Sequence, residues 1–150
     1  MTSPITSETD ADEWVSARVG ASGFEVELRA RTHALAADEP VSLGGTDRGP
    51  TPYELLLSAL GSCSAMTMRM YAHRKGWPLE GAVVSLRQGR PHERDCENCA
   101  TETVGIDRIE RRIELIGTLT DEQRARLLQI ADRCPVKQTL ERGLTIENVS

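Results

Sequence analysis

The chain has 150 residues, a formal net charge of −5 and few aromatic residues. This length fits one domain that can bury a sizeable core without staples. Binding to phosphates needs clustered Lys and Arg, so an acidic chain without a basic run is not expected to bind nucleic acid. No stretch reaches the roughly 20 apolar residues that span a bilayer, so we expect no membrane association and a small-molecule ligand.

The N-terminal segment, residues 1–12, is polar and acidic and lacks the apolar core of a secretion signal. We expect it to be a flexible tail before a domain over residues 13–150, and we expect the protein in the cytoplasm. Thiols stay reduced there, so four cysteines favour catalysis, metal binding or burial over a disulfide framework.

Three short strands are expected next. Residues 14–19 and 24–29 read as a hairpin, since Phe24, Val26 and Leu28 alternate with polar residues after a Gly-containing turn. A third strand is expected at 32–36. The segment that follows, up to Pro50, is rich in turn formers and reads as a loop.

A long helix is expected from Pro52 to Lys75, because both of its ends are marked. Thr51 can serve as N-cap, Pro52 suits the first helical position and Glu54 completes a capping box. Gly76 ends the helix. Its apolar residues cover nearly the whole circumference, which predicts a central or interface helix that is buried on most sides.

Two strands are expected in the second half of the chain, at 81–87 and 106–117, separated by a long polar loop over 89–103. The isoleucines of 106–117 also fit helical spacing, but the β-branched content favours a strand. The charges over 107–112 alternate in sign, which indicates an exposed face.

Thr120 and Gln123 predict a capping box at the start of the next helix. Its apolar residues fall on one face, which predicts that Cys134 points inward. Pro135 interrupts this helix and opens a short one that ends near Glu141. A last strand is expected at 144–149. The predicted order is βββ-α-ββ-αα-β.

Cys63 and Cys134 are the thiols that folding could bring together, as a redox couple or as two buried hydrophobes. Cys134 directly precedes Pro135, so its sulfur can lie near the free N–H groups at a helix start, which would lower its pKa. Cys63 lies mid-helix among apolar residues, where desolvation raises the pKa of a thiol. From the residues alone both readings stay open.

A second cluster, His92, Cys96 and Cys99, lies in the polar loop. Three readings apply to it: surface thiols, a zinc or accessory redox site, and a thioredoxin-like motif. Zinc wants four ligands, and this segment offers these three together with Asp95. The pair does not lie between a strand and a clear helix start, which argues against the third reading.

The run from Gly49 to Cys63, Gly-Pro-Thr-Pro-Tyr-Glu-Leu-Leu-Leu-Ser-Ala-Leu-Gly-Ser-Cys, and the later Cys134-Pro135-Val136 resemble the OsmC/Ohr family. The resemblance extends over about residues 38–148 and fits the broader OsmC-like subgroup. It implies an α+β fold with mixed β-sheets around a long central helix, and an intertwined homodimer with thiol sites near the interface.

The resemblance also implies a chemistry. In active members the helix cysteine attacks a hydroperoxide and becomes a sulfenic acid, a second cysteine converts it to a disulfide, and a dithiol reduces that disulfide. By motif position these catalytic roles fall on Cys63 and Cys134. The chemistry is reasonable, because a sulfenic acid condenses readily with a neighbouring thiol.

The chain departs from the family's hydroperoxide reductases at one position. They place a Glu directly after the helix-opening Pro to hold an activating Arg, whereas this chain has Tyr53 there and Glu54 one position later. At about 100° per residue, Glu54 and Cys63 lie on roughly opposite faces of a helix, so Glu54 is expected to be a cap. Candidates for the activating cation are Arg18, Arg31 and Arg48.

These observations predict a thiol-dependent peroxidase for organic hydroperoxides or hydrogen peroxide that uses Cys63 and Cys134 and needs no haem, flavin or metal. Its expected partners are a second copy of the chain and a dithiol reductant. One rival is a non-enzymatic OsmC-fold dimer that binds a ligand or zinc. Another is a structural dimer whose cysteines are packed residues.

Overall fold

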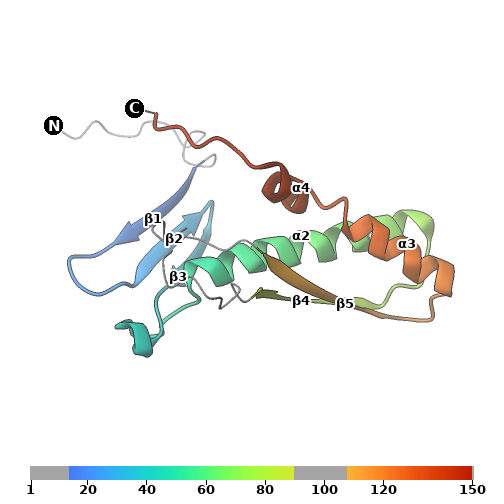
Figure 1. The fold of residues 1–150 in the computed structure, drawn as a ribbon, viewed down its shortest axis with the longest axis horizontal. Coiled ribbons are helices and arrows are strands. Elements are labelled where there is room, and N and C mark those ends of the chain that lie inside the picture. Colours follow the sequence, from blue (N-terminus) through green and yellow to red (C-terminus); the bar gives the residue numbers. More distant parts are fainter. Residues whose placement is uncertain (1–13, 90–107, 150) are drawn as a thin grey trace, which may run out of the picture. The chain divides into compact units, whose positions relative to one another are not determined.

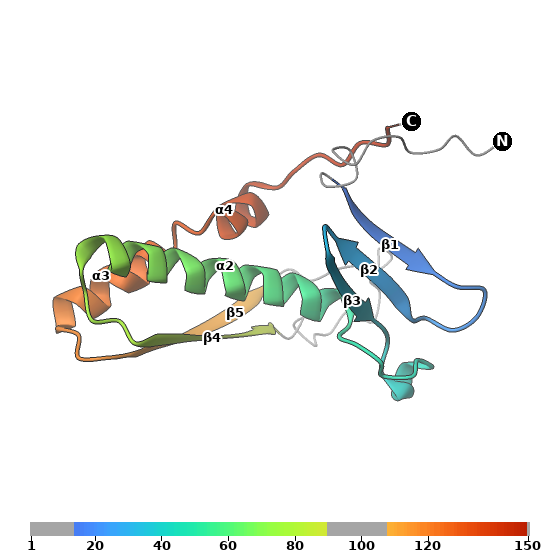
Figure 2. The same ribbon diagram turned by 180° about the vertical axis from the view of Figure 1, so that it is seen from behind.

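The computed structural model describes residues 14–89 and 108–149. The chain divides into two compact units, Met1–Leu56 and Leu57–Ser150, with the division inside a long helix. Strands and helices are mixed along the chain, as Figures 1 and 2 show, so the predicted α+β class is confirmed. Among the helices of the described residues, none is long and apolar enough to cross a membrane.

The first unit holds a three-stranded antiparallel sheet in the order β1-β2-β3. The strands are β1 (Val15–Val19), β2 (Val26–Ala30) and β3 (His33–Ala37), so the predicted strands are confirmed to within two residues. The turn between β2 and β3 is tight, because Ala30 pairs with His33, and Arg31 adopts a positive φ of 53° within it.

A buried carboxylate, Asp38, organises the loop after β3. It accepts hydrogen bonds from the Thr46 hydroxyl (2.6 Å) and from the backbone N–H groups of Glu39 (2.8 Å), Thr46 (3.1 Å) and Arg48 (3.2 Å). The Thr46 hydroxyl and these N–H groups lower the pKa of Asp38 against the effect of burial. The carboxylate therefore stabilises the fold above its ordinary pKa, and this stabilisation is lost as the pH falls through the lower folded-state value.

The same loop contains a short 3-10 helix, η1 (Val41–Leu43), which the sequence did not predict. Gly45 follows it where two backbone segments meet, since a Cβ at this position would collide with the backbone of Glu39. The turn formers of the sequence therefore build a fixed loop around Asp38.

Helix α2 (Pro52–Lys75) has the predicted bounds. The Thr51 N–H donates to Glu54 Oε2 (2.8 Å), and the Glu54 N–H donates to Thr51 Oγ1 (3.3 Å). This reciprocal pair is the predicted capping box. Gly76 follows the helix with a φ of 65°, the left-handed conformation that ends helices without strain.

One side of α2 is buried and the other is exposed. The buried side consists of Leu60, Gly61, Ser64, Met68 and Ala72. On the other side Met66 and Met70 are 63% and 65% exposed. The prediction that the helix is buried on most sides is therefore wrong for the single chain, because the second unit supplies packing partners for one side only.

The second unit is a hairpin packed against helices. Strands β4 (Gly81–Gln88) and β5 (Ile109–Ile116) pair antiparallel, which confirms the predicted strand character of the described part of 106–117. Helix α3 (Asp121–Ala131) lies beside the C-terminal half of α2, and the short helix α4 (Pro135–Arg142) follows it (Figures 1 and 2). The buried cluster of this unit comes from α2, α3 and the segment before β4, and it consists of Met68, Ala72, Leu79, Leu127 and Ala131.

The predicted last strand at 144–149 is wrong. These residues form no strand, and Leu144, Ile146 and Val149 are exposed, Ile146 to 86%. Alternating apolar residues form a strand only where a neighbouring strand supplies hydrogen bonds, and among the described residues the two sheets consist of β1–β3 and β4–β5. The expected tail, 1–12, lies outside the described residues.

Candidate active site

Cys134 lies at the junction between α3 and α4. The predicted capping box of α3 is present: Gln123 N–H donates to Thr120 Oγ1, and the Gln123 side chain accepts from the Thr120 N–H. After the last turn of α3, Cys134 becomes the N-cap of α4, with Pro135 at the first helical position. The Cys134 side chain is 0% exposed, so the predicted inward direction is confirmed.

Cys63 lies on α2, where the helix approaches the hairpin closely. Gly61, two residues earlier, makes this possible, because a Cβ there would come within 2.8 Å of Leu86 Cδ1 on β4. Cys63 itself is half-buried. Cys63 therefore keeps some access to solvent, whereas α2 packs closely against β4 at Gly61.

The two thiols lie near each other. Both are free, and each is among the groups that shift the pKa of the other. They come from a helix and from the junction of two others, so only the packing of the second unit brings them together. Two thiols that lie near each other are the arrangement that a disulfide requires.

The surroundings push the pKa values of the two thiols apart. Burial raises the pKa of Cys63, and the neighbouring Cys134 raises it further. Burial also raises the pKa of Cys134, but the Cys63 thiol, the N–H groups of Lys137 and Val136, and the Ser64 hydroxyl outweigh it and lower that pKa.

Arg111 connects the elements around Cys134. Its guanidinium donates to Ser64 Oγ (3.3 Å), to the Ala131 carbonyl (3.3 Å) and to Asp132 Oδ1 (2.7 Å). Only 18% of the Arg111 side chain is exposed. Arg111 thus holds Ser64 of α2 close to the end of α3, and the Ser64 hydroxyl is one of the groups that lower the pKa of Cys134.

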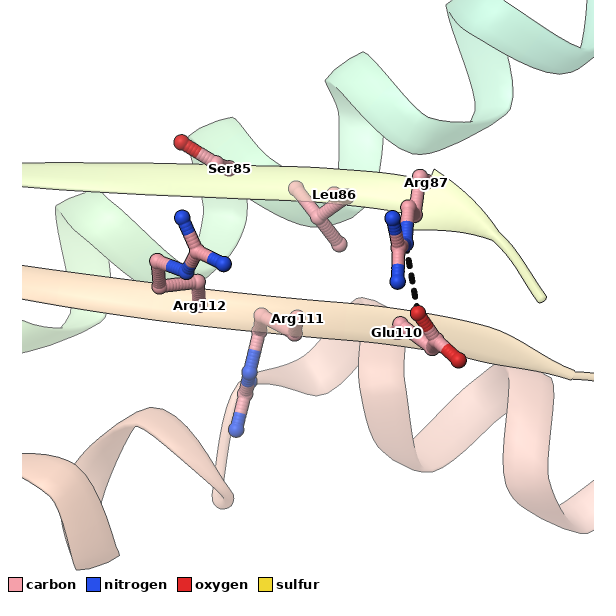
Figure 3. Close-up of a pocket in the computed structure, with 6 residues that line it drawn as sticks. All are labelled: Ser85, Leu86, Arg87, Glu110, Arg111 and Arg112. Carbon is pink, nitrogen blue, oxygen red and sulfur yellow. Dashed lines mark hydrogen bonds and ion pairs between the residues drawn. The ribbon is translucent and has the colours of Figure 1, made fainter.

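The direction of Arg111 follows from the pairing of the hairpin. Leu86 pairs with Arg111, and Ser85 pairs with Arg112, so the two arginines lie on opposite faces. Figure 3 shows the Arg111 side chain directed toward the segment that joins α3 and α4, while Arg112 points toward Ser85. The residues that line the pocket in Figure 3 come from both strands at this end of the hairpin. Two of them, Arg87 and Glu110, form an ion pair.

Sequence reasoning missed Arg111 and Ser64. The charges over 107–112 indicated an exposed face, and for Arg111 this is wrong. The signal that could have found it is the period of two in a strand, which places Arg111 on the same face as Ile109 and Ile113. The earlier candidates, Arg18, Arg31 and Arg48, all belong to the first unit, whereas Arg111 shares a unit with both thiols.

The predicted loop cluster, His92, Cys96 and Cys99, lies outside the described residues. Over 14–89 and 108–149, no group of three His, Cys, Asp or Glu side chains is arranged to hold a metal ion. Among the described residues, the pair Cys63 and Cys134 is therefore the candidate active site.

Comparison with known proteins gives a family and a fold. The chain matches the family described as OsmC-like protein over residues 45–148. A solved OsmC-like protein from Mycoplasma pneumoniae is 17% identical, with 85% of each chain covered and a TM-score of 0.69. The organic hydroperoxide resistance protein OsmC from Legionella pneumophila is 19% identical, with 85% of this chain and 87% of that chain covered and a TM-score of 0.60.

A third solved structure, an organic hydroperoxide resistance protein from Elizabethkingia anophelis, is 16% identical, with 84% and 86% coverage and a TM-score of 0.55. No match was found among curated protein sequences. At these identities the solved structures establish that the OsmC-like fold is shared, and the predicted OsmC-like α+β fold of the single chain is confirmed.

Proposed function

Since the chain belongs to the family of OsmC-like proteins, we propose that it is a thiol-dependent peroxidase that reduces organic hydroperoxides or hydrogen peroxide. The observation that supports the proposal is that two free thiols of unequal exposure, half-buried Cys63 and fully buried Cys134, lie near each other. Proteins of similar fold that are named for hydroperoxide resistance support the choice of substrate.

The reaction uses the two thiols in turn. The Cys63 sulfur attacks one peroxide oxygen, the O–O bond breaks, and the products are a Cys63 sulfenic acid and an alcohol, or water from hydrogen peroxide. Cys134 then attacks the sulfenic sulfur, which releases water and forms a Cys63–Cys134 disulfide. A second thiol near Cys63 favours this step, because a sulfenic acid that reacts quickly with a thiol is protected from further oxidation.

A dithiol reductant completes the cycle. One of its thiolates attacks the disulfide, and its second thiol releases the mixed disulfide, so two electrons return the protein to the reduced state. Attack at Cys63 is favoured, since Cys134 is 0% exposed. The cytoplasm, which keeps thiols reduced, is the expected compartment.

We also propose that the protein works as a homodimer. Met66 and Met70 on α2, and Leu144 and Ile146 after α4, are exposed apolar side chains that a second copy could cover. Sedimentation at low protein concentration tests this, with a dimer expected. A persistent monomer would contradict it.

The peroxidase proposal is tested by steady-state consumption of hydroperoxides of graded bulk with a dithiol reductant. Cys63→Ser removes the nucleophile, so we expect turnover to fall by more than about 1000-fold. Ser62→Ala is the matched control, because Ser62 is the exposed neighbour whose hydroxyl donates to the Ala59 carbonyl (3.1 Å). Turnover that survives in Cys63→Ser, or is absent in the unmodified protein, would overturn the proposal.

A further inference from the structure

Tyr71 on α2 stands among three cations that come from two helices. The Lys75 ammonium lies 5.8 Å and the Arg74 guanidinium 6.0 Å from the centre of its ring, both from the last turn of α2. The Arg126 guanidinium of α3 lies 5.6 Å from the same centre. Aromatic rings attract cations, so the Tyr71 ring gathers three positive charges at one place on the second unit.

Arg126 is the half-buried cation of the cluster, and its hydrogen-bond partners are neutral. Its Nε donates to the Tyr71 hydroxyl (3.2 Å), and its Nη1 donates to Gln129 Oε1 (3.0 Å). Within residues 14–89 and 108–149, neither Glu122, one turn earlier on α3, nor any other carboxylate forms an ion pair with Arg126. A charge withdrawn from water is costly without an opposite charge, so Arg126 favours an anion beside it.

Arg74 and Lys75 likewise have no carboxylate partner in the part of the chain that the structure describes, whereas Arg87 and Arg111 each have one. The end of a helix favours cations, which accounts for the two basic residues in the last turn of α2. It does not account for Arg126, which lies in the middle of α3. The convergence of cations from both helices therefore needs another reason.

The cluster lines an open cavity of about 420 Å³, whose walls are Tyr71, Arg74, Lys75 and Arg126. Figures 1 and 2 show α3 beside the C-terminal half of α2, the arrangement that brings these residues together. The volume is in the range of sites for small organic molecules. Tyr71 follows Cys63 by about 12 Å along the axis of α2, and neither thiol lines the cavity, so the cavity is separate from the candidate active site.

The Tyr71 hydroxyl lies in a positive potential. Its hydrogen bond with Arg126 lowers the pKa of Tyr71 against the effect of burial, and the charges of Arg126, Lys75 and Arg133 lower it further. The oxygen accepts from Arg126, so the hydroxyl proton remains for an acceptor in the cavity. Arg126 Nη2 forms no hydrogen bond within the described residues, so it too is available to such an acceptor.

We propose that this cavity binds the phosphate group of a small organic phosphate. A phosphate monoester carries a charge of about −1.5 to −2 at neutral pH and three terminal oxygens, so it can accept from donors that approach from several directions. A carboxylate has one charge and two oxygens in one plane. Arginine binds phosphate oxygens through paired N–H groups, and lysine adds a point charge. The three cations and the Tyr71 hydroxyl therefore fit a phosphate better than a carboxylate.

The net charge of the chain favours a small ligand over an extended one. At a net charge of −5 the protein as a whole repels nucleic acid and anionic membranes, and the cation cluster is confined to one cavity. A small phosphate can enter the cavity without meeting the acidic remainder of the surface. The proposal does not depend on the thiol chemistry, so failure of the peroxidase assay would leave it unchanged.

Binding is tested by isothermal titration calorimetry with phenyl phosphate at low ionic strength, where charges are screened least. Arg126→Met, and the double variant with Arg74→Met and Lys75→Met, remove charged donors, so each should raise the dissociation constant at least about tenfold. Arg112→Met removes the same charge as Arg126→Met, but it lies on β5 outside the cavity and should leave the constant unchanged. Undiminished binding by Arg126→Met, or no saturable binding by the unmodified protein, would overturn the proposal.

The chemistry of the ligand is tested with two further probes. Phenyl sulfate keeps the ring and the tetrahedral group but carries one negative charge, so its dissociation constant should be at least about fivefold higher. Equal affinity would contradict the assignment to phosphate. Vesicles with phosphatidic acid present a phosphate on an anionic surface, and we expect the protein not to sediment with them. Sedimentation that phenyl phosphate competes away would assign the cavity to a lipid and overturn the small ligand.

A titration of Tyr71 locates the ligand without altering the cations. Tyr53 and Tyr71 are the two tyrosines of the chain, so Tyr53→Phe leaves Tyr71 as the source of tyrosinate absorbance. A negative charge near the hydroxyl disfavours tyrosinate, so saturating phenyl phosphate should raise the pKa of Tyr71. An unchanged pKa at saturation would place the ligand elsewhere and overturn the proposal, even where the Arg126→Met protein does not fold.

Discussion

Helices α3 and α4 begin in different ways. At α3 the Thr120 hydroxyl and the Gln123 side chain satisfy each other's backbone N–H groups in an exposed capping box. At α4 the N-cap is Cys134, a buried sulfur without a regular capping bond, and the N–H groups of Val136 and Lys137 face it. The first N–H groups of a helix thus take part in a closed cap at α3, and at α4 they lower the pKa of a buried thiol.

The two helix starts differ in what their N–H groups are available for. In the capping box of α3 the side chains satisfy the N–H groups, so these groups are not available to a reacting atom. At the start of α4 the N-cap is a thiol, whose charge can change, and a second thiol, Cys63, lies near it. Substitutions at the two helix starts should therefore have different consequences, in stability for α3 and in chemistry for α4.

The largest effect is expected from Cys134→Ser. Serine is a good N-cap, so the variant should fold with stability close to that of the unmodified protein. It cannot form the disulfide, so turnover with a dithiol reductant should fall sharply, because the Cys63 sulfenic acid no longer has a second thiol of the protein beside it. Urea unfolding measures the stability and hydroperoxide consumption measures the turnover. A large loss of stability with full turnover would contradict the view that Cys134 serves the chemistry and not the stability of α4.

The next effect is expected from Leu127→Ala on α3. Leu127 is 0% exposed in the cluster with Met68 and Ala131, so removing its side chain should cost about 2–5 kcal/mol of unfolding free energy. Leu128→Ala is the matched control, since Leu128 is exposed. Urea unfolding measures both variants, and equal losses would show that the buried cluster does not hold α3 in place.

Arg111→Met tests the link between the two helix ends. It leaves the Ser64 hydroxyl and the Ala131 carbonyl without their donor, so the loss of unfolding free energy should be about 1–3 kcal/mol. The variant should also form the disulfide more slowly, because Ser64 is no longer fixed. Arg112→Met, on the opposite face in Figure 3, is the control and should leave both quantities nearly unchanged.

The smallest effect is expected from Thr120→Ala, which opens the capping box of α3 and should cost about 1 kcal/mol. Disulfide formation should proceed as before, because this cap takes no part in the chemistry. Exposed Thr118→Ala is the control, and thermal unfolding measures the difference. A Thr120→Ala protein with normal stability but slow disulfide formation would contradict the distinction between the two helix starts.

Local sequence signals predicted much of the fold. The bounds of α2 follow from Thr51, Glu54 and Gly76, and the start of α3 follows from Thr120 and Gln123, because capping depends on neighbours within a few residues. The inward direction of Cys134 follows from the helical spacing of Leu127, Ile130 and Ala131, which Cys134 continues just after α3 ends. These features need no knowledge of the rest of the chain.

Other features depend on contacts between distant segments. The run 144–149 has the alternation of a strand, but a strand needs a partner and the sequence cannot say whether one is present. Likewise, the exposed side of α2 at Met66 could not be told from the buried side at Met68 in a helix that is apolar all round. Arg111 was missed because its partners, Ser64 and Asp132, come from two other elements.

The central claim is that Cys63 and Cys134 form one redox pair, and peptide mapping after oxidation tests it most directly. Reduced protein receives one equivalent of an organic hydroperoxide per chain, is alkylated and is then digested. The account predicts the loss of two thiols per chain and a Cys63–Cys134 disulfide. Unchanged thiols, or a disulfide that joins other cysteines such as Cys96 and Cys99, would contradict it.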